Sequence, residues 1–292
     1  MKPLRKCMAT VSMGGTLAEK LAAIAGAGFD GIELLDDDLH KSAMSPAECA
    51  RRCADLGLTI DLYQPFRRAE GVPPGEFGAV LERFRRELEV MRGLGAEAIL
   101  VVSNTDSDAD AGRDRSAAQL AALGDVAAEH EMTVMFEALA WGTHISRVAD
   151  AWDVLRRADH PSLTLVVDTF HLLAGGEDVS AVERLPRDAV GFVQLADAPW
   201  LSMDLIAWSR GHRCFPGEGQ FGLVPLVASV MSSGYHGPLS LEIFNPGYRE
   251  RPAREIAQRA ADALAWFIDR LADAADPFAS ARTVPAQSGL VR

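Results

Sequence analysis

Segments typical of strands and segments typical of helices alternate along almost the whole of this 292-residue chain. Short apolar segments predict β-strands at 5–12, 31–35, 59–66, 98–104, 133–139, 163–171, 190–197 and 237–244. Amphipathic segments between them predict helices at 16–27, 45–56, 77–94, 113–131, 146–158, 180–185, 224–233 and 252–275. Because parallel strands need a long crossover between them, this alternation predicts a parallel sheet covered by helices.

The number of repeats distinguishes between two parallel-sheet folds. Eight β/α units are the number found in a (β/α)₈ barrel, and the runs AILVV and LTLVV are typical of strands covered on both faces. A doubly wound open sheet would also alternate, but the first turn, SMGGT, lacks the Gly-x-Gly-x-x-Gly fingerprint of dinucleotide binding. We therefore predict an α/β chain with one TIM-barrel domain over 1–275. The segment 276–292 loses periodicity and is predicted to be a flexible tail or linker stub.

Several predicted helices have recognisable ends. Ser45, followed by proline, and Ser146 predict helix starts, because a serine oxygen can accept a hydrogen bond from the first turn. Gly57 and Gly95 predict helix ends, where glycine readily adopts a left-handed conformation.

Composition excludes several classes of protein. The net charge of −12 argues against a nucleic-acid partner, and no run approaches the ~20 apolar residues that a membrane span requires. The amino terminus has the pattern of a first strand rather than a signal peptide. The four cysteines lack disulfide or zinc spacing, and Cys49 and Cys53 are predicted to be buried thiols. We expect a cytoplasmic protein, and a homo-oligomer is compatible with the sequence.

Four consecutive predicted strands each end on an oxygen-bearing side chain. The segments VMFEAL, LVVDTFH, GFVQLAD and LSLEIFN contain Glu137, Asp168, Gln194 and Glu242. A barrel delivers all four side chains to the same rim. A single carboxylate after an apolar run is usually a helix cap or an ion pair, but four such residues favour a divalent metal site. Their oxygen ligands favour Mg²⁺ or Mn²⁺ over zinc, with Co²⁺ as a further candidate.

Two histidines are candidates for proton transfer near this rim. His171 lies three residues after Asp168, so both side chains can face one site if the chain turns there. A structural histidine at a helix start is an equal alternative at this position. His144 lies in the loop after the fifth strand, where a role in the site is slightly favoured over a place as an ordinary loop residue.

Further polar residues follow the predicted strands. Arg67 and Arg213 are able to bind a carboxylate bidentately, although isolated surface arginines are common enough to make each assignment an even choice. Arg213 lies in the segment 198–221, which is long for a connection in a barrel, and such loops are often lids or binding loops. Gln64 and Glu33 end the third and second strands and are weaker candidates for polar contacts.

Several strings resemble those of bacterial 3-dehydroshikimate dehydratases, members of the xylose-isomerase-like TIM-barrel superfamily. They are TVSMGGT (10–16), GFDGIE (28–33), QPFR (64–67), FEALAWG (136–142), DTFH (168–171), FVQLADAP (192–199), RCFPGEG (213–219) and LSLEIFN (239–245). The resemblance covers residues 5–270 and matches Glu137, Asp168, Gln194 and Glu242 to metal ligands. Many superfamily members have histidine at the position of Gln194, and a related branch has histidine where this chain has Leu139.

The resemblance implies metal-dependent dehydration of 3-dehydroshikimate to protocatechuate through an enolate. His171 is the preferred base and His144 the second candidate, whereas Arg67, Arg213 and Gln64 would contact the substrate. Longer relatives carry a second domain resembling hydroxyphenylpyruvate dioxygenase. The alternatives are a metal-dependent sugar or polyol isomerase or epimerase, and a barrel that only binds or scaffolds. Endonuclease chemistry, also known in this superfamily, is disfavoured by the acidic charge and the seven histidines.

Overall fold

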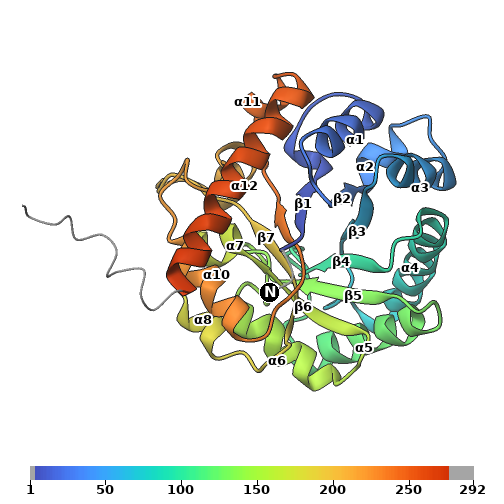
Figure 1. Cartoon of the computed structure of the whole chain (residues 1–292). Helices are drawn as coiled ribbons and strands as arrows, with labels where there is room; N and C mark the ends of the chain where they lie inside the picture. The colour runs from blue at the N-terminus through green and yellow to red at the C-terminus, as the bar shows by residue number, and fades with distance from the viewer. Residues whose placement is uncertain (1–3, 276–292) are drawn as a thin grey trace, which may run out of the picture.

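The structure, a computed structural model, describes residues 4–275 and contains a closed barrel of eight parallel strands joined in chain order. The strands are β1 (Lys6–Ala9), β2 (Gly31–Leu35), β3 (Thr59–Phe66), β4 (Ala98–Val102), β5 (Thr133–Glu137), β6 (Leu163–Asp168), β7 (Val190–Leu195) and β8 (Leu239–Leu241). Helices surround them on the outside of the barrel (Figure 1). The predicted fold class is confirmed.

The helices that follow β1 to β4 are η1 (Thr10–Ser12, a 3₁₀ turn), α1 (Leu17–Gly26), α2 (Asp36–His40), α3 (Pro46–Asp55), α4 (Pro74–Leu94) and α5 (Arg113–Ala128). Those that follow β5 to β8 are α6 (Val148–Ala158), α7 (Thr169–Ala174), α8 (Ser180–Glu183), α9 (Leu205–Gly211), α10 (Leu223–Ser232), α11 (Pro246–Arg249) and α12 (Ala253–Ala275). The short helices α2, α7, α9 and α11 were not predicted. The predicted tail at 276–292 lies outside the described residues.

Several strands end earlier than their sequence predicts, because the residues beyond the strand are buried without being part of the sheet. The predicted strand 163–171 ends at Asp168, whose carboxylate caps α7 by accepting hydrogen bonds from the backbone N–H groups of Phe170 and His171. The buried Phe170 and His171 therefore lie in a helix. This turn directs the side chains of Asp168 and His171 to the same region.

The helix ends follow capping chemistry in three of the four predicted places. Ser45 and Glu48 form a reciprocal capping box at the start of α3. Gly57 and Gly95 adopt left-handed φ angles of 73° and 66° after α3 and α4. The prediction for Ser146 was wrong, because α6 begins after Arg147 and the N–H of its first residue, Val148, donates to the carboxylate of Glu177 instead.

Inside the barrel, apolar side chains come first along the strands, and polar side chains lie at the carboxyl ends of the strands. One group of packed residues comprises Cys7, Leu62, Ala98, Leu100, Val102, Val166 and Phe192. Because side chains alternate along a strand, the residue two positions further along points to the same face. Gln64, Asp168 and Gln194 stand two residues after Leu62, Val166 and Phe192. The sheet therefore directs these three polar side chains into the barrel.

The described residues bear on two expectations from the sequence, which concern a membrane span and the cysteines. Within residues 4–275, no helix combines the length and apolar character that crossing a bilayer would need. All four cysteines are buried and free, including Cys49 and Cys53 in α3.

Candidate metal and substrate site

The four strand-end residues meet at one rim of the barrel. Glu137 is the last residue of β5, and Asp168, the last residue of β6, is paired in register with Gln194 of β7. Glu242 follows the last residue of β8. All four side chains are buried. The sequence-predicted set is thus brought together by strand register.

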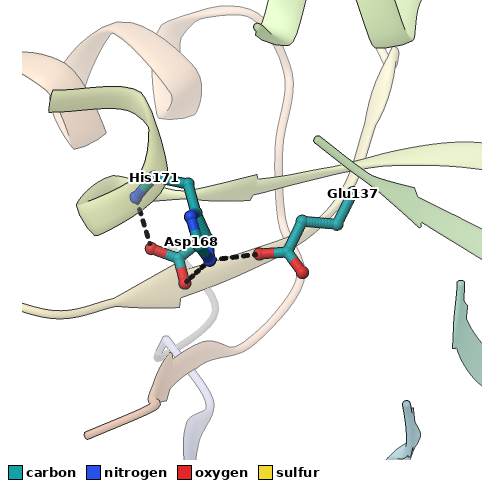
Figure 2. Close-up of side chains that lie close together, drawn as sticks. All are labelled: Glu137, Asp168 and His171. Atoms are coloured by element: carbon teal, nitrogen blue, oxygen red, sulfur yellow. Dashed lines mark hydrogen bonds and ion pairs between the residues drawn. The ribbon is translucent and has the colours of Figure 1, made fainter. Parts of the chain in front are cut away.

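Glu137, Asp168 and His171 form the tightest part of this cluster, with one potential ligand atom from each lying within 4.8 Å of the others. Figure 2 shows the imidazole of His171 between the two carboxylates. Its Nε2 atom lies 3.7 Å from Glu137 Oε1 and 4.0 Å from Asp168 Oδ2. His171 Nε2 is therefore a potential nitrogen ligand beside the all-oxygen set predicted from sequence.

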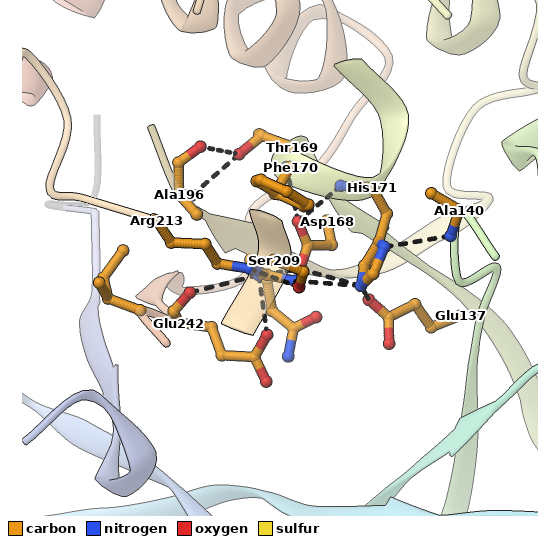
Figure 3. Close-up of polar contacts among 12 residues, drawn as sticks. Glu137, Ala140, Asp168, Thr169, Phe170, His171, Ala196, Ser209, Arg213 and Glu242 are labelled. Atoms are coloured by element: carbon orange, nitrogen blue, oxygen red, sulfur yellow. Dashed lines mark hydrogen bonds and ion pairs between the residues drawn. The ribbon is translucent and has the colours of Figure 1, made fainter. Parts of the chain in front are cut away.

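Arg213 lies against the same carboxylates (Figure 3). Its Nη1 atom lies 2.6 Å from Asp168 Oδ2 and 3.1 Å from Glu242 Oε2. The side-chain hydroxyl of Ser209 accepts hydrogen bonds from the same guanidinium, whose carbon lies 4.5 Å from the centre of the Phe170 ring. Arg213 is 1% exposed, so its charge is directed toward the carboxylates.

Burial and mutual repulsion set the electrostatics of this cluster. Burial and the neighbouring Asp168 and Glu242 raise the pKa of Glu137 well above its usual range. Burial also raises the pKa of Glu242, against the opposing effect of Arg213. Burial alone would raise the pKa of Asp168, but the charge of Arg213 holds it below its usual range. One guanidinium thus leaves most of the carboxylate charge uncompensated, and a divalent cation would offset it.

The donor atoms fit a bound cation. Among the described residues, Glu137 Oε1 and Gln194 Oε1 are buried without a hydrogen-bond partner. A buried oxygen without a partner is costly, and a metal ion would remove that cost at both atoms. Glu137, Asp168, Gln194 and Glu242 are therefore the residues that could hold a hard divalent cation.

His171 is a neutral imidazole approached by two donors. Burial lowers the pKa of His171 to about 3. The Ala140 N–H approaches Nδ1 at 3.1 Å, and Arg213 Nη2 approaches Nε2 at 3.0 Å. A neutral imidazole has one lone pair, so it accepts from only one of these donors at a time. Acceptance from Arg213 places the lone pair on Nε2, toward the carboxylates.

A cavity of about 420 Å³ opens onto the cluster. Of the residues predicted from sequence, its lining includes Gln64, Arg67, Glu137, His171, Arg213 and Glu242. Asp168 and Gln194 are not among the lining residues. The lining of the cavity therefore contains both carboxylates and cationic side chains.

Ser209 and Arg210 of α9 are among the cavity-lining residues that sequence reasoning missed. The guanidinium carbon of Arg210 lies 4.6 Å from the centre of the Phe244 ring. Arg210 is exposed, and its partial removal from water, together with the nearby charge of Arg67, lowers its pKa. The only sequence signal was the unusual length of the segment 198–221. Arg67 and Arg210 thus place two positive charges along the wall of the cavity.

His144 does not line the cavity. Its Nε2 atom lies 2.9 Å from both Glu70 Oε2 and Ser116 Oγ. Glu70 also accepts a hydrogen bond from the backbone N–H of Asn104, and its carboxylate is fully buried. The ring of His144 instead joins three loops around a buried carboxylate, and its predicted role in the site stays a prediction.

Known proteins give the fold and the site a family context. The chain is 44% identical over 261 residues to a 3-dehydroshikimate dehydratase of Pseudomonas putida and 47% identical over 267 residues to one of Pseudomonas aeruginosa. These alignments cover 89% and 91% of this chain but 41% and 42% of the relatives. The chain thus spans less than half the length of these two relatives, and its likeness to 3-dehydroshikimate dehydratases is confirmed.

A solved structure of a fusion between a xylose isomerase-like TIM barrel and a 4-hydroxyphenylpyruvate dioxygenase superimposes with a TM-score of 0.91 and 40% identity. The likeness covers 98% of this chain and 46% of the fusion, which confirms that longer relatives with a dioxygenase-like part exist. The family model described as xylose isomerase-like TIM barrel matches residues 21–282. The chain belongs to the xylose isomerase-like TIM barrel family.

Proposed function

We propose that this barrel is a lyase that dehydrates 3-dehydroshikimate to protocatechuate. The observation that carries the proposal is one cavity whose lining includes the buried carboxylates of Glu137 and Glu242 together with Arg67 and Arg210. Such a cavity suits a small anionic molecule with a ketone and hydroxyl groups. The likeness to the two Pseudomonas dehydratases supports the same substrate.

The proposed cofactor is one divalent ion, Mg²⁺ or Mn²⁺, held by Glu137, Asp168, Gln194 and Glu242. When bound, it would stabilise negative charge on the substrate carbonyl oxygen as the adjacent proton leaves, which gives an enolate. The buried oxygens of Glu137 and Gln194 that lack partners among the described residues support this set. Arg213 would remain the internal countercharge of Asp168 and Glu242.

His171 is the proposed base. It removes the proton alpha to the ketone. The electron pair of the broken C–H bond forms the carbon–carbon double bond of the enolate. As the carbonyl re-forms, the C–O bond of the beta hydroxyl breaks, and the hydroxyl takes the proton held by His171 and leaves as water. Transfer of a proton from the ring CH₂ group to the ketone oxygen then completes the aromatic ring. The position of Nε2 beside Glu137 and on the cavity wall supports this role.

Arg67 and Arg210 are the proposed partners of the substrate carboxylate. Both line the same cavity, which supports this assignment. Arg213 is less suited to this role than the sequence suggested, because Asp168 and Glu242 already engage its guanidinium. Gln64 keeps its predicted place at the cavity wall.

The proposed setting is the reducing cytoplasm, in agreement with four free buried cysteines. A small-molecule substrate, rather than a nucleic acid, is the proposed partner because the chain carries a net charge of −12.

An ultraviolet assay for protocatechuate tests the proposal. The protein is incubated with 3-dehydroshikimate and Mg²⁺, Mn²⁺ or Co²⁺, and formation of the aromatic product is followed by absorbance. We expect product from the wild type, loss of product in Glu137→Gln, and unchanged turnover in Glu82→Gln, whose carboxylate is exposed on α4. No product from the wild type with any of the three metals would refute the proposed reaction.

A further inference from the structure

Glu33 of β2 is the one carboxylate in this cluster that neither lines the cavity nor belongs to the proposed ligand set. Its side chain is completely buried. Its Oε2 atom accepts a hydrogen bond from Gln194 Nε2 at 2.6 Å and another from Gln64 Nε2 at 2.9 Å. One oxygen of Glu33 therefore holds two amide groups that come from β3 and β7.

These contacts determine which end of the Gln194 amide faces the metal site. The NH₂ group of Gln194 points toward Glu33 and donates to its Oε2 atom at 2.6 Å. The carbonyl oxygen then points away from Glu33, and it has no hydrogen-bond partner among residues 4–275. Only that oxygen can bind a cation, because an amide NH₂ group has no available lone pair.

Gln64 extends the same arrangement to a second ligand. Its NH₂ group has two hydrogens, one directed to Glu33 and the other to Glu242 Oε1 at 3.0 Å. Both hydrogens are used, so the orientation of Glu242 is tied to Glu33 through one intervening amide. The carboxylate of Glu33 thus contacts the proposed ligand Gln194 directly and is connected to the proposed ligand Glu242 through Gln64.

We propose that Glu33 is a positioning residue that makes Gln194 an oxygen ligand and fixes Glu242 through Gln64. The inference deepens the proposed function, since it rests on the same metal site. The terminal torsion of a glutamine side chain is broad, with two orientations that exchange oxygen for nitrogen. Without an acceptor at position 33, both orientations of Gln194 become populated, and one of them presents NH₂ to the cation.

Binding of Mn²⁺, measured by isothermal titration calorimetry without substrate, tests this role. Glu33→Met removes the acceptor at similar size and is expected to weaken Mn²⁺ binding about 10–100-fold, the usual effect of losing a residue that orients a ligand. Glu33→Gln keeps one oxygen that can accept from both amides, so its affinity should stay within about threefold of the wild type. The matched control is Asp61→Asn, a largely buried carboxylate that contacts Arg5 and Thr59. It should bind Mn²⁺ as the wild type does.

A double variant separates amide orientation from loss of charge. Glu33→Met combined with Gln194→Glu keeps the net charge of the pair, and a carboxylate presents oxygen in either orientation. Its Mn²⁺ affinity should therefore recover most of the loss seen in Glu33→Met. Thermal unfolding of each variant establishes that the compared proteins are folded, and Glu33→Leu, which also removes the acceptor and carries the same expected loss of affinity, replaces Glu33→Met if that variant does not fold.

The inference is overturned if Glu33→Met binds Mn²⁺ as tightly as the wild type, or if Glu33→Gln is as weak as Glu33→Met. It also fails, together with the proposed metal site, if the wild type binds no Mn²⁺. If the variants behave as expected but no protocatechuate forms from 3-dehydroshikimate, the proposed reaction fails while the role of Glu33 stands.

Discussion

The guanidinium of Arg213 donates to the carboxylate of Asp168 at 2.6 Å, and both side chains are almost fully buried. The same nitrogen reaches Glu242, so one arginine joins two proposed metal ligands that come from β6 and from the rim after β8. An arginine in this position limits repulsion among the carboxylates and keeps their oxygens close together. The site is thus held together in part by a cation supplied by the chain itself.

Substitution of Arg213 by methionine should destabilise the fold strongly. Loss of one partner from a buried ion pair leaves an uncompensated charge, which typically costs about 3–5 kcal/mol. Equilibrium unfolding in urea measures the difference. Arg86→Met, at an exposed position of α4 outside the cavity, serves as the control and should leave the free energy of unfolding nearly unchanged. A loss below about 1 kcal/mol for Arg213→Met would contradict the importance of the pair.

Arg67→Met and Arg210→Met should each weaken substrate binding. A hydrogen bond to a charged group contributes about 1.5–3 kcal/mol, which corresponds to a KM increase of about 10–100-fold. We expect kcat to change much less, because neither side chain acts on the reacting carbon atoms. Steady-state kinetics on 3-dehydroshikimate provides both constants. Unchanged KM in both variants would show that the substrate carboxylate binds elsewhere.

His171→Asn should lower kcat by about 10²–10⁴-fold, which is the usual contribution of a positioned base. Its KM and its Mn²⁺ affinity should change little if the ring acts in proton transfer rather than as a ligand. Kinetics and calorimetry on the same preparation separate these roles. A loss of Mn²⁺ binding comparable to that of Glu137→Gln would instead make His171 a metal ligand.

His144→Asn should reduce stability rather than catalysis. The hydrogen bond and the charge of Glu70 raise the pKa of His144 above 6.5, with a smaller contribution from Asp110. Burial and the charge of Arg113 oppose this shift. Because the folded-state pKa is raised, the extra stability is complete below the unfolded-state pKa and is lost as the pH rises through the folded-state pKa. Thermal unfolding should show a larger difference between wild type and variant near pH 6 than near pH 9, with kcat close to wild type at neutral pH. The opposite trend would contradict a stabilising Glu70–His144 pair.

The sequence predicted the barrel and its rim because both depend on local patterns. An apolar run followed by an acid or amide marks the end of a strand at Glu137, Asp168, Gln194 and Glu242, and a closed parallel sheet then aligns those ends. The helix α9 was missed, and Arg210 with it, because a seven-residue helix inside a long loop has no strong periodicity.

Contacts between residues that are far apart in the sequence could not be predicted in the same way. The contact between Glu70 and His144 joins residues 74 positions apart, and nothing near either residue specifies the other. The sequence likewise identified Arg213 as a cation near the site, but only the packing against Ser209 and Phe170 shows that it faces the carboxylates. Glu33 was recognised as a polar strand end, whereas its two amide partners depend on the closure of the barrel.

Formation of protocatechuate at this site should depend on a divalent cation. The most direct measurement follows protocatechuate absorbance for protein treated with a chelator and dialysed, before and after Mn²⁺ is added back. We expect no measurable turnover of 3-dehydroshikimate after chelation and recovery of turnover when Mn²⁺ is added. The Glu137→Gln variant should show no recovery. Full activity in the chelated protein, or a chelated protein that Mn²⁺, Mg²⁺ and Co²⁺ all fail to reactivate although it remains folded, would contradict this dependence.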